Sequence, residues 1–446
     1  MEKNITNEQL NKYKNKFNKK AKNKILQNAI TKNGIINASY NTFEVSKLQN
    51  IFNVEVKDMV SVTNQKQSGR CWMFASLNII RPIIAKNLGT KDIDLSFTYL
   101  FFYDKLEKAN NLLNLAIENI DKELDSREIE SLISNGPEAD GGWWCNFKAL
   151  IEKYGIVPIN ASPEVYSSTN SSELDNVLFT LLTKDIYILK QNYNNKKDKE
   201  YLYTLKDDFL NEVYKILSLS LGTPVDKFKF DYKQDLNEKE PKIKHIKSTP
   251  IEFYNTYLKK DLNDYIILVN YPTDKYPYYQ KYQNKSALTM TDSSYYAINL
   301  PIEELKFAAI NSLKDNNPMW FAADVSQMSL RKDGILSLKA YDLEKLFDIN
   351  FKYDKYQRCK MHASTCSHAM TLTGVNIEKN GKPSRWKVQN SWGTENGFNG
   401  IYIMSDDWFN EYLYEIVVDK KYLSEKVLKV LEDENIVDVD IFDCLA

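Results

Sequence analysis

The segment NQKQSGRCWMFASLN occupies residues 64–78, and its cysteine, Cys71, stands directly before an apolar run. This run, WMFASLNIIRPIIAK (72–86), predicts a buried helix in spite of Pro82. A thiol at a helix N-terminus faces the positive end of the helix dipole and unpaired N–H groups, which favour the thiolate. Gly69 permits a tight turn before it. Cys71 is therefore a candidate nucleophile, although a cysteine before a helix is more often a small buried residue.

A base for this thiol has to be sought among three histidines. His368 begins the strand-like run HAMTLTGVNI, which the turn KNGK and the run RWKVQNSW extend into a predicted β-hairpin. Asn390 follows His368 by 22 residues. His362 is the rival base, but no apolar strand follows it directly, and His245 lies in the charged run KIKHIK. His368 is therefore a candidate to take the thiol proton, and the family resemblance given below implies that role and the role of Asn390 in orienting the ring.

Composition and charge exclude several function classes. The 446 residues suffice for a large core and two or three domains. A net charge of -1, from 59 basic and 60 acidic side chains, gives no general attraction to nucleic acid or an anionic membrane. No run approaches the roughly 18 apolar residues of a membrane span, and the charged N-terminus is unlike a signal peptide. We expect a cytoplasmic protein without cofactor, metal, membrane or nucleic-acid partner.

The order of the motifs indicates a family. Gln65, Cys71, His368 and the run Asn390-Ser-Trp-Gly occur in the order of the papain superfamily. His368 follows Cys71 by 297 residues, whereas papain has about 130–150, which predicts a large insertion between them. Over nearly its whole length the chain resembles the bleomycin hydrolase/aminopeptidase C family, the cytosolic branch of that superfamily. The resemblance is carried by residues 64–78, LSFTYLFFYDKLEKAN (95–110), DGGWWCNFKALIEKYGIVP (140–158), MWFAADV (319–325), SHAMTLTGV (367–375) and QNSWG (389–393).

The resemblance implies further roles around the nucleophile. The side-chain amide of Gln65 and the backbone N–H of Cys71 would bind the developing oxyanion, and each such donor is typically worth about 2.7–4 kcal/mol. Trp392 would shield the bond between His368 and Asn390 from water. Ser68 stands where secreted relatives have a disulfide-bonded cysteine, which agrees with a reducing compartment.

The resemblance also assigns the substrate groove. Gly141 and Gly142 match glycines whose backbone pairs with substrate, although a plain turn also explains them. A C-terminal arm would lie in the cleft, where the carboxylate of Ala446 would hold the free α-amino group of the substrate. The tail EDENIVDVDIFDCLA ends in Leu-Ala but lacks the usual Pro and Trp of the family. Cys444 would lie close to Cys71 if this arm enters the cleft.

The expected architecture follows from the same resemblance. It is an α+β, papain-like two-lobed catalytic domain, with a helical lobe, a β-barrel-like lobe, and inserted helical and hook subdomains that mediate assembly into a homohexamer. Helical patterns at 174–190 and 200–221 and a charged, solvated stretch at 226–247 lie within the insertion. The expected divisions are an N-terminal arm and helical lobe, the insertion, the β-rich lobe and the C-terminal arm, at 1–159, 160–315, 316–431 and 432–446.

The predicted function is a cysteine aminopeptidase that removes N-terminal residues from peptides through a thioester acyl-enzyme. The altered tail leaves a cysteine endopeptidase on the same scaffold as an alternative. A nucleic-acid-binding or scaffolding protein with a degenerate site is a second alternative, opposed by the near-neutral charge and the complete set of catalytic positions. An acyltransferase or transglutaminase is a third, opposed by Asn390, since those enzymes usually complete the triad with Asp.

Overall fold

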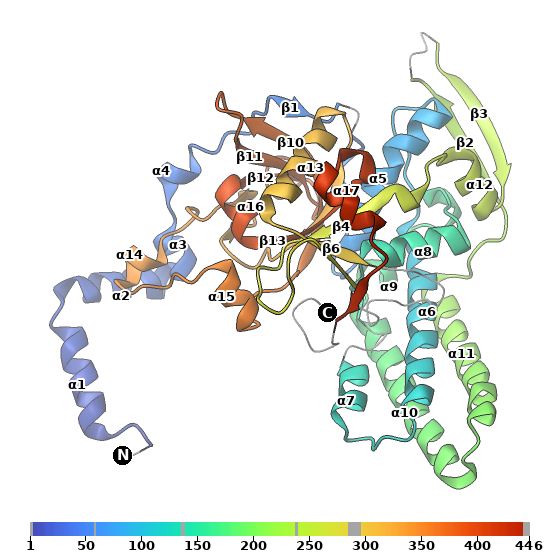
Figure 1. Cartoon of the computed structure of the whole chain (residues 1–446), viewed down its shortest axis with the longest axis horizontal. Coiled ribbons are helices and arrows are strands. Elements are labelled where there is room, and N and C mark those ends of the chain that lie inside the picture. Colours follow the sequence, from blue (N-terminus) through green and yellow to red (C-terminus); the bar gives the residue numbers. More distant parts are fainter. Residues whose placement is uncertain (1–2, 58, 135–138, 237–239, 284–295, 440–446) are drawn as a thin grey trace.

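The computed structural model describes residues 3–57, 59–134, 139–236, 240–283 and 296–439, and its elements gather mainly into a helical lobe and a strand-rich lobe (Figure 1). Each lobe has its own core of buried apolar side chains. The α+β composition agrees with the expectation. Among the described residues, no helix is both long and apolar enough to cross a membrane.

The helical lobe is built around the predicted apolar helix. This helix, α5, runs over Cys71–Leu88 without interruption at Pro82 and ends at Gly89, whose φ of +76° is left-handed. Ser96 caps the next helix by accepting a hydrogen bond from the Tyr99 N–H at 3.0 Å. The remaining helices and 3₁₀ turns of this lobe are α6 (Phe97–Glu118), α7 (Arg127–Ser134), α8 (Trp144–Tyr154), η1 (Ile159–Ala161), α9 (Tyr166–Thr169), α12 (Pro250–Tyr257) and η2 (Leu262–Asp264).

The strand-rich lobe is one mixed sheet. Its described strands lie in the order β14-β5-β6-β4-β13-β7-β10-β11-β12-β9-β8, and β1 pairs with β10. Their bounds are β1 (Val54–Glu55), β4 (Tyr265–Val269), β5 (Gln280–Gln283), β6 (Ala297–Asn299), β7 (Met319–Ala323), β8 (Ser329–Leu330), β9 (Ile335–Leu336), β10 (His368–Ile377), β11 (Pro383–Gln389), β12 (Ile401–Ser405), β13 (Leu413–Asp419) and β14 (Ile436–Asp438).

Helices cover this sheet and connect its strands. Apolar side chains of α13 and α16, including Leu305 and Phe409, join the core of the strand-rich lobe. The helices and the 3₁₀ turn of this lobe are α13 (Ile302–Lys314), α14 (Leu343–Phe347), α15 (Lys355–Lys360), α16 (Asp406–Tyr412), η4 (Lys420–Tyr422) and α17 (Glu425–Glu432). The predicted hairpin is confirmed as β10 paired antiparallel with β11, with Thr371 opposite Gln389.

The two lobes meet where α5 lies against β10 and β7. The indole Nε1 of Trp320 on β7 donates to the carbonyl oxygen of Trp72 at 3.1 Å, and the Nδ2 of Asn78 donates to the Thr371 hydroxyl at 3.2 Å. These buried bonds hold the start of α5 against β7 and its middle against β10. The two elements that carry the candidate nucleophile and base are therefore fixed to each other.

Residues 160–315, the predicted insertion, divide between the helical lobe and the strand-rich lobe. Helices α10 (Ser172–Lys196) and α11 (Lys199–Leu221) extend from the helical lobe, longer than the predicted patterns (Figure 1). The charged stretch is indeed largely exposed, but it forms a hairpin, β2 (Phe228–Gln234) with β3 (Lys242–Ser248). By contrast, β4, β6 and α13 lie within 160–315 and yet belong to the strand-rich lobe, because β4 pairs with β13.

The described part of the N-terminal arm has four helices, of which the first two extend away from both lobes and the last two lie against the strand-rich lobe. They are α1 (Asn7–Asn18), α2 (Ala21–Asn33), α3 (Ile35–Ser39) and α4 (Thr42–Val45), and α1 projects furthest (Figure 1). Neither α1 nor α2 has a buried residue, and Phe17 is 46 % exposed. Within the described part of one chain, α1 and α2 therefore bury no side chain of their own.

Candidate active site

Cys71 is the first residue of α5, and its side chain is partly exposed. Its Sγ lies 3.9 Å from the carbonyl oxygen of Gly69. Burial raises the pKa of the Cys71 thiol, and the charge of Asp140 raises it further, whereas backbone N–H groups of Ala369 and of the first turn of α5 lower it. Ala369 follows His368 directly. The thiol therefore lies beside the start of β10, where the predicted base is found.

His368 begins β10 and Asn390 directly follows β11, so the hairpin brings the two residues to one end of the sheet. The Nε2 of His368 lies 2.8 Å from the Oδ1 of Asn390. The backbone N–H of Ser391 donates to the same Oδ1 at 2.7 Å, which fixes this oxygen toward the ring. The imidazole consequently donates from Nε2 and keeps the lone pair of Nδ1 for a proton.

Trp392, the residue expected to shield this pair, packs on the His368 ring. Its indole stacks on the His368 ring with centroids 4.4 Å apart and an interplanar angle of 23°. Tyr402 on β12 meets Trp392 edge-on at 5.8 Å, and the guanidinium carbon of Arg331 lies 3.9 Å from the indole centroid. An aromatic cover of this kind keeps water away from the hydrogen bond between His368 and Asn390.

The electrostatics of the base and the thiol are linked. Burial lowers the pKa of His368 to about 4, the hydrogen bond to Asn390 raises it, and the charge of Arg331 lowers it. Burial therefore opposes a lone imidazolium, as it opposes a lone Cys71 thiolate. Moving the proton from the thiol to the ring creates both charges together, and their mutual attraction offsets the cost of burial.

Gln65 is bound to the segment that follows Asn390. Its backbone N–H donates to the Ser391 carbonyl at 2.8 Å, and its side-chain Oε1 accepts from the Ser391 hydroxyl at 2.6 Å. The Nε2 donates to the Ser68 carbonyl at 2.6 Å. An amide nitrogen has two hydrogens, so this bond leaves a second N–H for an oxyanion. The side chain is 6 % exposed and rigidly placed.

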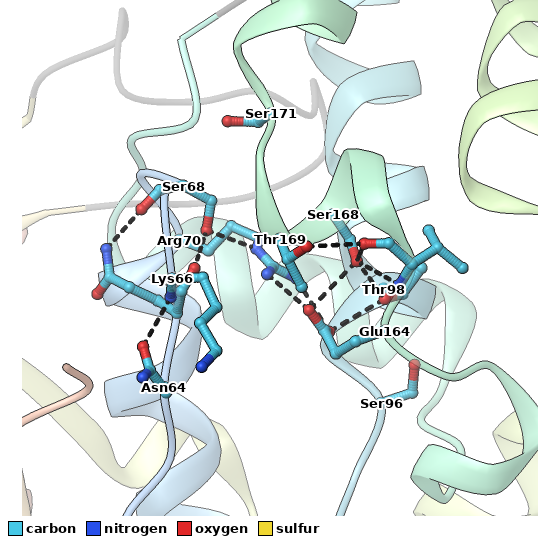
Figure 2. Close-up of polar contacts among 12 residues, drawn as sticks. Asn64, Lys66, Ser68, Arg70, Ser96, Thr98, Glu164, Ser168, Thr169 and Ser171 are labelled. Atoms are coloured by element: carbon cyan, nitrogen blue, oxygen red, sulfur yellow. Dashed lines mark hydrogen bonds and ion pairs between the residues drawn. The ribbon is translucent and has the colours of Figure 1, made fainter. Parts of the chain in front are cut away.

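A buried guanidinium holds the turn before the nucleophile (Figure 2). Arg70 is fully buried, and its Nη1 and Nη2 donate to the two carboxylate oxygens of Glu164 at 3.1 and 2.8 Å. Its Nε donates to the Ser68 hydroxyl at 2.9 Å. Glu164 also accepts from Thr98 and Ser168 at 3.0 and 3.2 Å. Such a bidentate, fully hydrogen-bonded pair fixes geometry as well as charge.

Asp140 connects the turn before Cys71 to helices α6 and α10 of the helical lobe. Its Oδ2 accepts from the Gly69 N–H at 2.7 Å and from the Ser171 hydroxyl at 2.6 Å. Its Oδ1 lies 2.8 Å from the ammonium of Lys105, which is fully buried and pairs equally closely with Asp175. Burial raises the pKa of Asp140, but the Lys105 charge prevails and holds it below its usual value.

The two glycines predicted to meet substrate lie beside this network. The Lys108 ammonium donates to the Gly141 carbonyl at 2.6 Å and to Asp104 at 2.7 Å. A Cβ on Gly142 would lie 2.6 Å from the Trp72 ring, whereas one on Gly141 would meet nothing within 4 Å among the described residues. Close packing on Trp72 therefore requires glycine at position 142.

The remaining candidates are two histidines and two residues near the chain end. His362 is exposed, and His245 is an exposed residue of β3 that pairs with Asp231 at 2.7 Å. Ala446 and Cys444 fall outside the described residues. In that described part, no group of three or more His, Cys, Asp or Glu side chains is arranged to hold a metal ion.

Sequence reasoning missed the supporting charges. Asp140 stands directly before the two glycines, and only its place in the motif DGG could have drawn attention to it. Arg331 lies in a charged turn with no signal of its own. Phe97, the first residue of α6, stacks on Phe74 in the helical core with centroids 3.6 Å apart.

Comparisons with known proteins cover the whole chain. Residues 4–446 match the model of the Peptidase C1-like family. Aminopeptidase E of Lactobacillus helveticus is 38 % identical over 447 residues, covering 99 % of both chains. Aminopeptidase C of Listeria monocytogenes is 38 % identical over 439 residues, covering 98 % of this chain and 97 % of its own.

The fold agrees with a solved relative. The crystal structure of PepW from Lactobacillus rhamnosis HN001 matches with a TM-score of 0.94 at 36 % identity, covering 100 % of this chain and 99 % of its own. This match confirms the expected fold class. With both the sequence and the fold matched from end to end, the chain belongs to the Peptidase C1-like family.

Proposed function

We propose that this chain is a cysteine aminopeptidase that uses Cys71 as nucleophile, His368 as base and Asn390 to orient that base. The observation that carries the proposal is the 2.8 Å bond from His368 to Asn390, next to a thiol at the first residue of a helix. Full-length relatives that are named aminopeptidases C and E support the exopeptidase activity.

The reaction follows from these positions. His368 takes the Cys71 proton at Nδ1, and the thiolate attacks the carbonyl carbon of the scissile amide. The backbone N–H of Cys71 and the free Nε2–H of Gln65 bind the oxyanion. The C–N bond then breaks, His368 gives its proton to the leaving amine, and a thioester remains. Water, deprotonated by His368, attacks the thioester and releases the N-terminal residue.

The substrate side of the proposal concerns the glycine turn and the chain end. Gly141 and Gly142 would present backbone groups to the substrate next to the nucleophile, and Lys108 would hold the turn in place. The carboxylate of Ala446 would bind the α-ammonium group of the substrate, since an opposite charge selects peptides with a free N-terminus. Residues 432–446 would form the arm that places it there.

Assembly and location belong to the same proposal. We propose a cytoplasmic homohexamer in which 1–159 form the arm and helical lobe, 160–315 contain the inserted helical and hook subdomains together with β4, β6 and α13 of the strand-rich lobe, and 316–431 form the rest of that lobe. The exposed apolar side chains of α1, such as Phe17, and the exposed hairpin β2–β3 support contacts with other copies. Light scattering would then give six times the mass of one chain.

A substrate panel tests the activity. Aminoacyl methylcoumarylamides with a free amino group are compared with their N-acetylated counterparts, on the full chain and on a chain that lacks 443–446. The full chain is expected to cleave only free-amine substrates, and the truncated chain to gain internal cleavage. Equal rates on acetylated and free substrates with the full chain would instead establish the endopeptidase.

Histidine variants test the base on a matched background. His368→Ala is expected to lose at least about 1,000-fold in kcat/KM, in keeping with loss of a triad member. His362→Ala is the control, because this exposed histidine lies six residues earlier on the same segment. Equal losses in the two variants would contradict the assignment.

A further inference from the structure

Arg331 lies in the turn between β8 and β9, and neighbouring elements hold that turn firmly. The Tyr402 hydroxyl donates to the Arg331 carbonyl at 2.6 Å. The N–H of Gly397 donates to the carbonyl of Lys332 at 3.0 Å. Both bonds involve the backbone of the turn, so they persist when the side chain at position 331 is changed.

The Arg331 side chain reaches the candidate active site through an aromatic contact. Its guanidinium carbon lies 3.9 Å from the indole centroid of Trp392, which is within the range of a cation–π contact. The same indole stacks on His368 at 4.4 Å. A planar guanidinium can stack on an aromatic ring in a way that a lysine ammonium cannot. Arg331 therefore contacts one face of the indole of Trp392, which itself stacks on His368.

The charges around His368 make Arg331 distinctive. After burial, Arg331 is the charge that lowers the pKa of His368. Asp324 follows the β7 residue opposite His368, but the hydroxyls of Ser326 and Ser364 donate to its carboxylate. Among the described residues, Asp140 raises the pKa of the Cys71 thiol, and Asp333, on the same turn as Arg331, raises that of the Tyr40 hydroxyl.

We propose that Arg331 is a positioning residue that rests on Trp392 and sets the upper pH limit of the active thiolate–imidazolium pair. This inference rests on the proposed function. A cation near the ring favours loss of the imidazolium proton, so activity ends at a lower pH than it would without Arg331. Because Arg331 is exposed, salt weakens its effect.

The experiment measures how the alkaline limb of activity depends on this side chain. The full chain is compared with Arg331→Met, which loses the charge, and Arg331→Lys, which keeps it. Lys332→Met is the matched control, because this exposed cation neighbours Arg331 but makes no contact with Trp392 that the structure records. The readouts are kcat/KM on an aminoacyl methylcoumarylamide and the rate of Cys71 alkylation by iodoacetamide, both from pH 4 to 10.

Arg331→Met is expected to move the alkaline limb upward by about 0.3–0.5 pH unit at low salt, a size set by a screened charge near the ring. Arg331→Lys and Lys332→Met are expected to keep the wild-type limb. High salt moves the wild-type limb toward that of Arg331→Met.

An unmoved limb in Arg331→Met, or an equal shift in Lys332→Met, would overturn the inference and leave the proposed function intact. If the Cys71→Ala variant still hydrolysed the substrate, the proposed function itself would be refuted. The two failures are therefore distinguishable.

Discussion

The nucleophile side and the base side of the site are held by opposite means. Around Cys71, two fully buried cations do the positioning, with Arg70 paired to Glu164 and Lys105 paired to Asp140 and Asp175. Around His368, the contacts are one hydrogen bond to a neutral amide and one aromatic stack. The cation on that side, Arg331, is exposed.

This difference matches what each side has to do. The turn that carries the thiol and the oxyanion donors has to stay fixed, and buried ion pairs with full hydrogen bonding tolerate little movement. The imidazole has to gain and lose a proton in every cycle. A neutral amide and an aromatic cover accept both states, whereas a buried partner charge would favour one of them. Variants on each side therefore test this division of roles.

The largest expected effect comes from the buried ion pairs. Asp140→Ala removes one of the carboxylates that pair with buried Lys105 and the acceptor of the Gly69 N–H, so we expect a loss of about 3–5 kcal/mol in the free energy of unfolding. Urea unfolding measures this loss against the control Asp208→Ala, which removes an exposed carboxylate. A loss below about 1 kcal/mol would show that these charges do not hold the turn.

The next effect separates the oxyanion donor from the nucleophile. Gln65→Ala is expected to lower kcat/KM by about 100–1,000-fold, which corresponds to one donor of about 2.7–4 kcal/mol. Alkylation of Cys71 by iodoacetamide forms no oxyanion, so its rate is expected to stay near that of the wild type. Gln67→Ala, at an exposed position two residues on, serves as the control. Equal losses in hydrolysis and alkylation would argue that Gln65 acts by holding the thiol.

A smaller effect tests the packing of the glycine turn. Gly142→Ala puts a Cβ 2.6 Å from the Trp72 ring, and we expect this overpacking to cost about 1–3 kcal/mol in stability and to raise KM. Gly141→Ala is the matched control, because its Cβ meets nothing within 4 Å in the described part of the chain. If both variants unfold at the wild-type midpoint, the contact with Trp72 does not constrain the turn.

The smallest effect concerns an unpaired acid on the sheet side. Glu415 on β13 is buried, its Oε1 has no hydrogen-bond partner among the described residues, and burial raises its pKa to about 8. The ordinary pKa of a glutamate is near 4.5, so above that pH the unfolded chain has released the Glu415 proton. The folded chain, with its raised pKa, still holds it. The stabilising contribution is complete below the ordinary value and is lost as pH rises toward 8.

Glu415→Gln removes this dependence. Relative to wild type, we expect the variant to gain stability steadily as pH rises from 5 to 8. Glu434→Gln, an exposed carboxylate near the chain end, is the control and is expected to show no such trend. A wild-type stability that does not fall relative to Glu415→Gln over this range would indicate that Glu415 is ionised in the folded chain.

The sequence sufficed for the local elements and the candidate triad. The apolar run after Cys71 predicted α5, and the alternation after His368 predicted the hairpin that brings Asn390 to the base. These inferences succeed because periodicity and motif spacing are local properties of the chain.

Contacts distant in sequence could not be predicted in this way. Arg331 reaches His368 only through Trp392, and Asp140 meets Lys105 only after the helical lobe has packed. The placement of β4 in the sheet depends on pairing with β13, about 150 residues further along the chain. Neither partner signals the other by composition or spacing.

The most direct test of the central claim is the rate at which iodoacetamide alkylates Cys71 at pH 6 in the wild type, His368→Ala and His362→Ala. An isolated thiol with a pKa near 8.5 is almost fully protonated at this pH, whereas a thiolate paired with imidazolium reacts rapidly. We predict fast alkylation in the wild type and in His362→Ala, and a rate at least about 100-fold lower in His368→Ala. Equal rates in all three proteins would contradict the account, because the reactivity of Cys71 would then not depend on His368.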